Sequence, residues 1–583
     1  MKKLLTFLLL LIIKPAFTQE FTQTIKGRIV DQQAKSPLIG VSITVENSKP
    51  TQGAVSDLNG YYKISNVAIG RVSLKVSSIG YKEQTIQNVL LTTGKEFVLD
   101  IDMEEQVTQL AEINVSASSQ RNAIEKGLVS VSSKSFNVED TRRYAGSRND
   151  PARMVAGFAG VTSNNDSRND IIIRGNSPSG VLWRVEGVDI PNPSHFGALG
   201  ATGGPVSMLN NNLLAKSSFL TGAFPAMYGN ATAGVFDLQL RNGNSDKREF
   251  TGQIGFNGVE AGLEGPFSKN SKASYLINYR YSVLDFVKKL GLNFGTGSGV
   301  PSYQDLSFKI NVPTTKFGVF NFFGIGGNSN IAFRDEQGDN FYAGSNQNLD
   351  YATSMGILGL SNTYFFTPKT SGKLTLLATY SSAKTKVDSL VKQNNTITGS
   401  HLDYNDNSSQ SKQVISYTIN HKWNAKNSSS IGITYTGFNL HYVDSTFTDN
   451  RYKTLHNFQG TTSFLQSYVN WQNRPNERLT INTGVYYQRF MLNNTQSIEP
   501  RVGLRYKLDD KQTMSLGLGH HAQLQNLQIY FNNNGGSLTN KNLDMTYSDQ
   551  VVLGYDRSLN SNVRFKAEAY YQALSNIPVE KTA

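Results

Sequence analysis

The side chains best suited to metal-ion or nucleophilic chemistry are few in this chain of 583 residues, and their spacing fits no common catalytic pattern. None of the seven histidines begins an H-E-x-x-H or a His-x-x-Glu pattern, so the usual ligand spacings of zinc peptidases are missing. No G-x-S-x-G sequence presents a nucleophilic serine, and the chain has no cysteine for thiolate ligands or disulfides. The sequence therefore disfavours a secreted peptidase or hydrolase and predicts no catalytic residue, no metal site and no cofactor.

The elements that must position the remaining polar side chains are β-strands, which dominate the second half of the sequence. From Leu479 to Gln488, apolar residues such as Ile481 and Val485 fall on one face of the expected strand, and residues such as Asn482 and Gln488 fall on the other. About 15 such segments fit this template between residues 250 and 574. A soluble antiparallel sheet alternates in the same way. Segments long enough for a tilted membrane strand, roughly 9–11 residues, favour a membrane barrel.

The connections between these segments alternate between short and long, as in outer-membrane barrels. Short polar turns follow the even-numbered segments, for example 313–315, 367–372, 424–428 and 509–511. Longer stretches rich in Asn, Ser, Thr, Asp and Gly follow most odd-numbered segments, the main ones being 285–302, 328–351, 386–410, 444–461 and 524–546. If the chain enters the barrel from the periplasm, the long loops face outside.

Composition and the N-terminus indicate the compartment. Mean hydropathy is -0.35, and no apolar run beyond the N-terminal one approaches the length of a membrane helix. Lys2 and Lys3 precede an apolar run at 4–13, and Ala16 offers a small residue for cleavage, so residues 1–18 are predicted to be a signal peptide. The net charge of +12 comes from scattered Lys and Arg without a basic cluster, which disfavours nucleic-acid binding and suits a surface near anionic lipid. We expect the outer membrane of a Gram-negative cell.

The first folded domain is predicted at 19–105, with short strands separated by turns. Its sequence resembles the carboxypeptidase regulatory-like domain at 27–31, 37–43, 57–62 and 78–81. About seven short strands would make an immunoglobulin-like sandwich. The resemblance implies an accessory domain without chemistry of its own.

The next region resembles the plug domain of TonB-dependent outer-membrane receptors. The matching segments occur in the family's order, at 150–161, 171–175, 185–191, 222–229 and 233–238. The accessory domain and the triplet Glu499-Pro500-Arg501 look like the Bacteroidota-type branch. Where an Asp-Gly pair is commoner, this chain has Glu186-Gly187. The fold class expected is therefore all-β dominated: the sandwich, an α/β plug, and part of a transmembrane antiparallel barrel.

This resemblance implies the remaining boundaries and the partner. The plug would occupy 120–245 and the barrel 246–583, and the segment 106–119 would contact the energy-coupling TonB protein. The TonB box would be Glu112, Ile113, Asn114, Val115, Ser116 and Ala117, which suits strand addition to a partner's sheet. By spacing alone, a simple linker would be the favoured interpretation of this segment.

Site residues are also assigned by position in the plug and barrel. Arg174 and Arg184 are candidates for locking the plug to inward carboxylates such as Glu264 or Glu568, with lumen solvation as the alternative for Arg174. The turn with Asn176, Ser177 and Ser179 is either a plug apex that meets ligand or a plain hairpin turn. His195 and His521 are candidate ligand contacts, or simply polar lining. We expect no metal at either histidine.

The family's barrel has 22 strands, so the strands found here predict an incomplete barrel and a truncated or fragmentary chain. The leading function is energy-coupled import of a scarce small-molecule, oligosaccharide or peptide ligand, with a surface lipoprotein as a possible further partner. The alternatives are a non-transporting surface receptor or adhesin on the same scaffold, and a non-functional fragment.

Overall fold

A computed structural model describes residues 21–107, 131–136, 138–163, 165–255, 258–269, 271–283, 299–335, 346–394, 396–534, 537–560 and 563–579. Two compact units account for them, the first made mainly of the chain up to Asp31 with Pro37–Glu105 and the second mainly of Ala123–Ala583. Within the described ranges, no helix has the length and apolar character needed to cross a membrane. The predicted signal peptide and TonB box both lie outside these ranges.

The first unit is a sandwich of two small sheets, as predicted. One sheet has the order β4-β1-β7, with β8 also on β1, and the other has the order β3-β2-β5-β6. The strands are β1 (Thr22–Asp31), β2 (Ser42–Val45), β3 (Gly53–Val55), β4 (Tyr61–Ala68), β5 (Gly70–Ser77), β6 (Gln84–Leu91), β7 (Phe97–Val98) and β8 (Ile101–Met103). Alternate residues such as Ile25, Ile43 and Leu74 are fully buried between the sheets, so this unit has its own apolar core.

The plug is built on a five-stranded mixed sheet of order β13-β12-β17-β16-β9, in which β12 and β17 run parallel. Its strands and helices are β9 (Ser133–Phe136), α2 (Val138–Arg143), α3 (Pro151–Val155), β10 (Val161–Ser163), β11 (Ile171–Ile173), η1 (Pro178–Gly180), β12 (Val181–Val185), β13 (Val188–Asp189), β14 (Ser194–His195), β15 (Val206–Ser207), η2 (Asn211–Leu213), β16 (Ser217–Thr221) and β17 (Gly234–Leu238). Asp150 caps α3, because its Oδ1 accepts a 2.9 Å hydrogen bond from the Ala152 amide. Trp183 stacks on Phe236 in the plug core.

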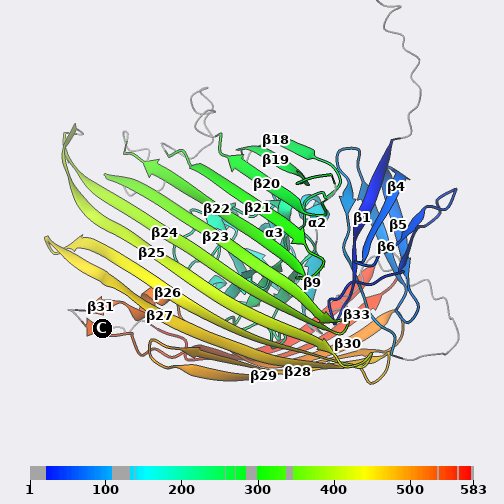
Figure 1. Ribbon diagram of the computed structural model, residues 1–583. Helices are drawn as coiled ribbons and strands as arrows, with labels where there is room; N and C mark the ends of the chain where they lie inside the picture. The colour runs from blue at the N-terminus through cyan, green and yellow to red at the C-terminus, as the bar shows by residue number, and fades with distance from the viewer. Residues whose placement is uncertain are drawn as a thin grey trace, which may run out of the picture. The chain divides into compact units, whose positions relative to one another are not determined.

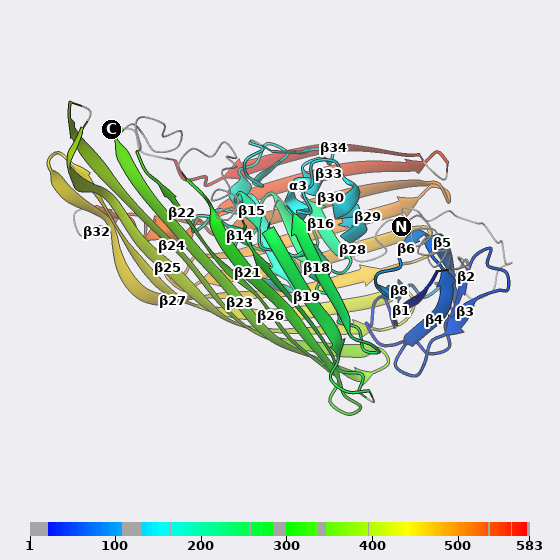
Figure 2. The same cartoon turned by 90° about the horizontal axis from the view of Figure 1, so that it is seen from above.

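In the described residues, fifteen consecutive strands form one antiparallel sheet from β18 to β34. They are β18 (Glu249–Gly255), β19 (Gly258–Pro266), β20 (Ser274–Tyr281), β21 (Ser302–Pro313), β22 (Val319–Phe333), β23 (Gln347–Thr367), β24 (Thr370–Gln393), β25 (Thr396–Lys422), β26 (Asn427–Thr448), β27 (Arg451–Asn473), β28 (Leu479–Phe490), β29 (Gln496–Lys507), β30 (Gln512–Gln523), β33 (Thr546–Ser558) and β34 (Arg564–Ser575). The sheet curves around the plug (Figure 1), whose β14, β15 and β16 lie in its concave side (Figure 2). The predicted strand number is confirmed, and no described pairing joins β18 to β34.

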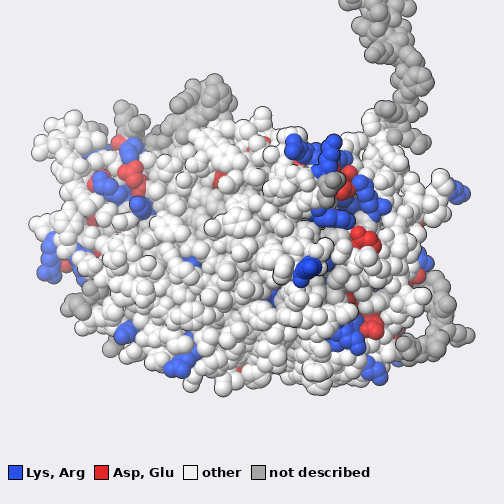
Figure 3. All heavy atoms as spheres, in the orientation of Figure 1, with Lys and Arg blue, Asp and Glu red and all other residues white. Residues whose placement is uncertain are grey.

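The two faces of the sheet differ as the alternation predicts. On β28, Asn482, Tyr486 and Gln488 are buried against the plug side, whereas Val485 is 45% exposed on the other face. Charged side chains are sparse over the middle of the strands and gather toward their ends (Figure 3). An apolar outer face with a polar inner face is the arrangement required of strands that cross a membrane around a polar interior.

Two predicted loops are wrong, because the structure continues the strands through them. Residues 386–410 and 444–461 belong to β24, β25, β26 and β27, and β25 alone has 27 residues. A membrane crossing uses only about 9–11 of these residues. Beyond the membrane both faces meet water, so the alternation of apolar and polar residues disappears although the pairing of strands continues.

The other predicted loops are only partly correct. Residues 328–351 begin in β22 and end in β23, and most of 285–302 lies outside the described residues. The stretch 524–546 contains α5 (Leu527–Tyr530) and the short strands β31 (Asn533–Asn534) and β32 (Ser537–Leu538). β31 lies beside the outer part of β27 (Figure 1).

The division of β25 into a membrane-crossing part and an outer extension predicts different effects for two similar substitutions. Ile415 and Ile397 are 56% and 52% exposed on the same strand. Ile415→Arg should destabilise the folded barrel by about 2–4 kcal/mol, because Ile415 faces lipid. Ile397→Arg should change stability by no more than about 0.5 kcal/mol, because its side chain meets water. Urea unfolding in lipid vesicles measures both, and equal effects would contradict the proposed membrane boundary.

Candidate plug–barrel interface and outer pocket

The tight turn between β12 and β13 carries the best-anchored carboxylate of the plug. Arg184 pairs with Asp189 and Val185 with Val188, so Glu186 and Gly187 are the two central residues of a hairpin. Their φ angles of 53° and 90° are those of a left-handed turn, which explains the glycine. The turn directs the Glu186 side chain toward the barrel wall.

Glu186 accepts hydrogen bonds from two barrel lysines and from the plug itself. The Nζ of Lys309 on β21 lies 2.8 Å from Oε1, and the Nζ of Lys373 on β24 lies 3.3 Å from Oε2. The Leu240 amide donates to Oε1 at 3.0 Å, and the Lys309 Nζ also donates to the Leu240 carbonyl. Glu186 and Lys309 are buried, so this cluster replaces water by fixed partners on both sides of the interface.

The electrostatics of this cluster hold Glu186 in its charged form. Burial by itself would raise the pKa of Glu186, but the ammonium groups of Lys309 and Lys373 outweigh burial and lower the pKa to about 2. In the sequence, Glu186 stands out only as a departure from the commoner Asp-Gly pair. The longer side chain is what reaches both lysines.

Arg174 bridges the plug to the last described strand of the sheet. Its guanidinium Nη2 lies 2.8 Å from Oε2 of Glu568 on β34 and also donates to the Ser132 hydroxyl at 2.8 Å. The guanidinium carbon lies 4.4 Å from the ring centroid of Tyr570. The structure thus places Arg174 against one of the two carboxylates considered for it.

Arg184 is placed differently from the sequence prediction. Its guanidinium lies 3.1 Å from Asp189 and donates to the Met227 and Gly187 carbonyls, all within the plug. Glu264 instead pairs with Arg241 at 2.7 Å. Arg184 therefore holds the hairpin together and contacts neither proposed barrel carboxylate, because the hairpin supplies a nearer partner.

A second anchor that the sequence reasoning missed is Arg501 on β29. Its guanidinium donates to the Pro225 carbonyl at 3.0 Å and to the Tyr228 carbonyl, and it pairs with Glu499 of the same strand. Arg501 and Glu499 are both buried, and Glu499 also accepts a hydrogen bond of 2.8 Å from Gln488. The barrel thereby holds a plug turn through the backbone, so the plug sequence gives no sign of this contact.

His195 makes another contact between the plug and the barrel wall, and its side chain is fully buried. Its Nε2 lies 3.0 Å from Oδ2 of Asp305 on β21, and Arg280 donates to the same oxygen at 2.7 Å. Burial lowers the pKa of His195 despite Asp305, so the imidazole is neutral at neutral pH and makes a hydrogen bond. The adjacent Phe196 amide donates to the hydroxyls of Ser329 and Thr353, both at 3.1 Å. His195 therefore attaches the plug loop to the wall and is closed to a ligand in this state.

His521 is likewise closed to a ligand. Its ring lies 4.4 Å from the Phe224 ring of the plug and is fully buried beside Arg501. The alternation correctly predicts that His521 faces the plug side, but the plug covers it completely. His520, on the other face, contacts Asp549 at 2.7 Å.

The turn 175–180 lies beside the outer ends of β30 and β34. Asn176 is buried and donates to Gln572 at 2.8 Å, and Gln523 donates to the Ser179 carbonyl at 2.6 Å. The side chains of Ser177 and Ser179 are exposed. Of the three residues predicted for ligand contact here, these two serines remain open, whereas Asn176 fixes the turn to the barrel.

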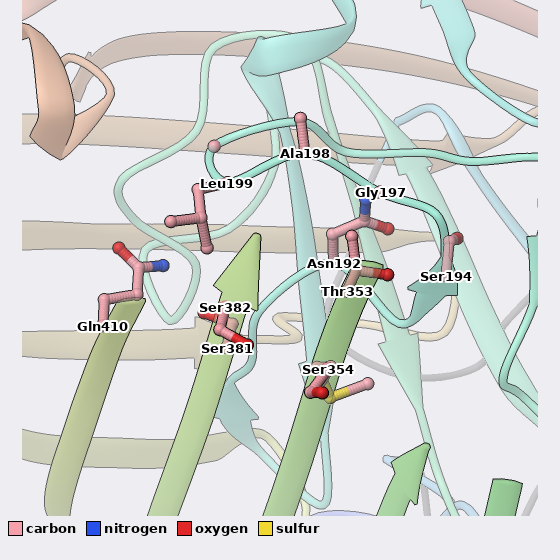
Figure 4. Close-up of a pocket in the computed structure, with 12 residues that line it drawn as sticks. Asn192, Ser194, Gly197, Ala198, Leu199, Thr353, Ser354, Ser381, Ser382 and Gln410 are labelled. Atoms are coloured by element: carbon pink, nitrogen blue, oxygen red, sulfur yellow. The ribbon is translucent and has the colours of Figure 1, made fainter. Parts of the chain in front are cut away.

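A small pocket lies between a plug loop and three barrel strands. It is a cavity of about 30 Å³, lined by Asn192, Ser194, Gly197, Ala198, Leu199, Gly200, Thr353, Ser354, Met355, Ser381, Ser382 and Gln410. The loop lies beside the strands, with Leu199 and Asn192 directed toward Ser381, Ser382 and Thr353 (Figure 4). None of these lining residues is charged. The lining residues lie in the first half of β23 and near the middle of β24 and β25.

No group of three or more His, Cys, Asp or Glu side chains in the described ranges is arranged to hold a metal ion. The geometry instead defines a class of protein. A lipid-facing sheet encloses a separate folded domain, and the domain is attached by polar side chains at several points. This is a plugged barrel of the outer membrane.

Three family models match the chain and agree with this geometry. The "Carboxypeptidase regulatory-like domain" matches residues 24–104, the "TonB-dependent Receptor Plug Domain" matches 127–235, and "TonB dependent receptor-like, beta-barrel" matches 294–583. The chain therefore belongs to the TonB-dependent receptors, which are transport receptors of the outer membrane. A comparison with curated proteins finds no match.

Solved structures with the same fold include two receptors and one outer membrane transporter. A mutant of the ferric enterobactin receptor from Pseudomonas aeruginosa is 14% identical, covers 79% of this chain and 72% of its own, and gives a TM-score of 0.52. The outer membrane transporter YddB from Escherichia coli is 12% identical, with 76% and 69% coverage and a TM-score of 0.53. The ferric yersiniabactin uptake receptor FyuA from Yersinia pestis is 14% identical, with 76% and 72% coverage and a TM-score of 0.54. At these identities the similarity concerns the fold.

Proposed function

We propose that this receptor imports a scarce ligand across the outer membrane by TonB-coupled movement of its plug, without chemical change of the ligand. The observation that carries the proposal is the nature of the plug–barrel interface. The plug is held by hydrogen bonds and ion pairs around Glu186, Arg174 and Arg501, and by an apolar cluster that it shares with barrel residues such as Phe323 and Ile357. The polar contacts can exchange with water when the plug moves.

The similar structures support this function. Two are named as receptors for the ferric chelates enterobactin and yersiniabactin, and one as an outer membrane transporter. We propose that the ligand first meets the outer pocket and the exposed Ser177 and Ser179, and that TonB binds Glu112–Ala117 from the periplasm. Neither the outer pocket nor the pair Ser177 and Ser179 identifies the class of ligand. The Bacteroidota-type branch, the domain boundaries and a surface lipoprotein partner stay predictions.

The TonB box is tested by a proline at its centre. Ile113→Pro should weaken binding of the periplasmic domain of TonB by about tenfold or more, because proline removes a donor and cannot continue an added strand. Ser116→Ala keeps the backbone donors and is the matched control. Binding is measured by cross-linking in cells and by titration of the purified full-length receptor.

Import is measured in a strain for which this receptor is the sole route for a required nutrient. Ile113→Pro should abolish ligand-dependent growth, whereas Ser116→Ala should support it. Growth that persists with Ile113→Pro would favour the alternative of a non-transporting surface receptor. Equal TonB binding by both variants would place the box elsewhere.

A further inference from the structure

Lys412 places a positive charge on the inner face of β25 that has no direct counter-ion among the described residues. Its Nζ makes no hydrogen bond and no ion pair with them; it lies 5.7 Å from the ring centroid of Phe438, and Asp189 of the plug attracts it at longer range. Asp189 is itself paired with Arg184 at 3.1 Å. Because Lys412 is partly buried, its charge is screened less than that of a surface lysine.

Two hydroxyl groups beside Lys412 also have no partner in the described part of the chain. Thr379 on β24 lies directly opposite Lys412 in the strand register, and Ser381 is the next residue of β24 on the same face. The two residues are 5% and 7% exposed, and neither hydroxyl makes a hydrogen bond. Side chains directly opposite each other have Cβ atoms about 4.5–5.5 Å apart. One short stretch of the wall therefore holds an ammonium group and two buried hydroxyls, all three able to donate hydrogen bonds.

The same stretch of wall lies between two cavities. Ser381 and Gln410 are directly opposite each other on neighbouring strands, and both line the outer pocket beside the plug loop (Figure 4). Val414, two residues beyond Lys412 on the same face, lines a second cavity of about 30 Å³ against the β12–β13 hairpin. Further wall residues of this second cavity carry hydroxyls, namely Ser416, Thr418, Thr434 and Thr436. Along β25, Lys412 is thus the inward-facing residue between the outer pocket and the second cavity.

We propose that Lys412 and the hydroxyls of Thr379 and Ser381 bind an anionic oxygen group of the ligand, a carboxylate or a phosphate, at the inner side of the outer pocket. The proposal rests on the import function above and names the class of ligand. Hydrogen bonds to an anionic oxygen are about twice as strong as those between neutral groups. One such group supplies the missing counter-ion and accepts from all three donors.

Other ligand chemistries match these side chains less well. A neutral hydroxyl group could accept from Thr379 or Ser381, but it would leave the Lys412 ammonium without a counter-ion. A cationic group would be repelled by the same ammonium. The charge of Lys412 therefore decides between an acidic ligand and a neutral or basic one.

The first test measures the charge selectivity of the site. The chain has no cysteine, so Gln410→Cys introduces a single thiol, two residues from Lys412 on the same face and roughly 7 Å away along the strand. The purified full-length receptor is labelled with two methanethiosulfonates, one bearing a sulfonate and one a trimethylammonium group. Lys412→Gln should lower the ratio of anionic to cationic labelling rates about tenfold, because losing the charge slows one reagent and speeds the other. Lys412→Arg should preserve the ratio.

The matched control for this test is Lys384→Gln. It removes the same charge from an exposed position of the neighbouring strand β24, and it should leave the ratio unchanged. An equal ratio in the native receptor and in Lys412→Gln would overturn the proposal, as would an equal fall in Lys384→Gln.

The second test separates a binding site from a merely positive surface. Labelling of Gln410→Cys by a neutral maleimide is followed in acetate, in inorganic phosphate and in chloride at equal ionic strength. Acetate or phosphate should slow labelling at least about threefold relative to chloride, and the more effective anion distinguishes a carboxylate from a phosphate site. Lys412→Gln should lose this protection, and so should Thr379→Val combined with Ser381→Ala. Protection by neither anion, or protection that persists in either variant, would overturn the proposal.

Both tests use the purified receptor without TonB, so they can fail independently of the import function. Protection by an anion without the growth defect of Ile113→Pro would keep this site and contradict TonB-coupled import. The growth defect of Ile113→Pro without protection would keep import and remove the anion site.

Discussion

Replacing Glu186 with glutamine is expected to weaken the attachment of the plug to the barrel by about 3–5 kcal/mol. The amide keeps the shape of the side chain but removes the negative charge that both Lys309 and Lys373 face. Two ammonium groups then remain close together with only neutral oxygens as partners. Because Lys309 is buried, water cannot replace the lost charge at its side of the cluster.

The measurement is the thermal unfolding of the plug relative to the barrel in detergent, followed by near-ultraviolet circular dichroism and by heat modification on electrophoresis. A matched control is Glu83→Gln in the first unit, where Glu83 pairs with Lys75 at 3.1 Å but both side chains are largely exposed. That substitution should change stability by less than about 1 kcal/mol. Comparable small effects from both substitutions would show that the Glu186 cluster is not a principal anchor.

The same cluster predicts a pH dependence with a definite sign. The pKa of Glu186 falls from an ordinary value of 4.5 to about 2 in the folded protein. A depressed carboxyl pKa stabilises the folded state fully above the unfolded value, and this stabilisation is lost as pH falls toward the folded value. The attachment of the plug should therefore be constant between pH 7 and pH 5 and weaken from about pH 4.5 toward pH 2. Glu186→Gln should remove this part of the acid sensitivity.

Arg501→Met should have an effect of similar size, and changing its partner as well should reduce that effect. The single substitution leaves Glu499 buried without its cation and leaves the Pro225 and Tyr228 carbonyls without a donor. Breaking a buried ion pair costs about 3–5 kcal/mol, whereas replacing both partners is far milder. The double variant Glu499→Gln with Arg501→Met should therefore be more stable than Arg501→Met alone.

A double-mutant cycle over Glu499 and Arg501 measures this difference by urea unfolding of the plug. We expect a coupling free energy of about 2 kcal/mol, together with a residual loss in the double variant from the unpaired plug carbonyls. An additive cycle would mean that Arg501 acts only through the plug backbone. Binding of TonB should be unchanged in all three variants, which separates attachment of the plug from coupling.

Strand positions and faces were predictable because lipid and plug impose opposite polarities on the two faces of each strand. Val485 and Gln488 illustrate this on β28, where one is exposed and the other fully buried as the alternation indicates. The same rule failed outside the membrane, where β25 continues without alternation to Thr396. Pairing of backbone groups requires no pattern of side chains, so the sequence carries little record of these extensions.

Contacts between plug and barrel were predictable only where a charged plug side chain pairs with a charged side chain of the barrel. Arg174 and Glu568 were both named from sequence, and the structure brings them to 2.8 Å. Arg501 donates hydrogen bonds to backbone carbonyls of the plug. Because every residue has a backbone carbonyl, no residue type in the plug sequence indicates this contact. Glu186 and Lys309 are 123 positions apart in the sequence. Only the fold shows that Lys309, on the inner face of β21, meets the plug turn that carries Glu186.

The parallel pairing of β1 with β7 and β8 sets the order in which the secreted chain can acquire structure. The sandwich is complete only when Met103 is present to pair with Asp31, and all of its core residues come before that point. Domains with their own core generally fold as units and in the order of synthesis. We therefore expect the first unit to fold as soon as Met103 is available, without waiting for the strands from β18 onward.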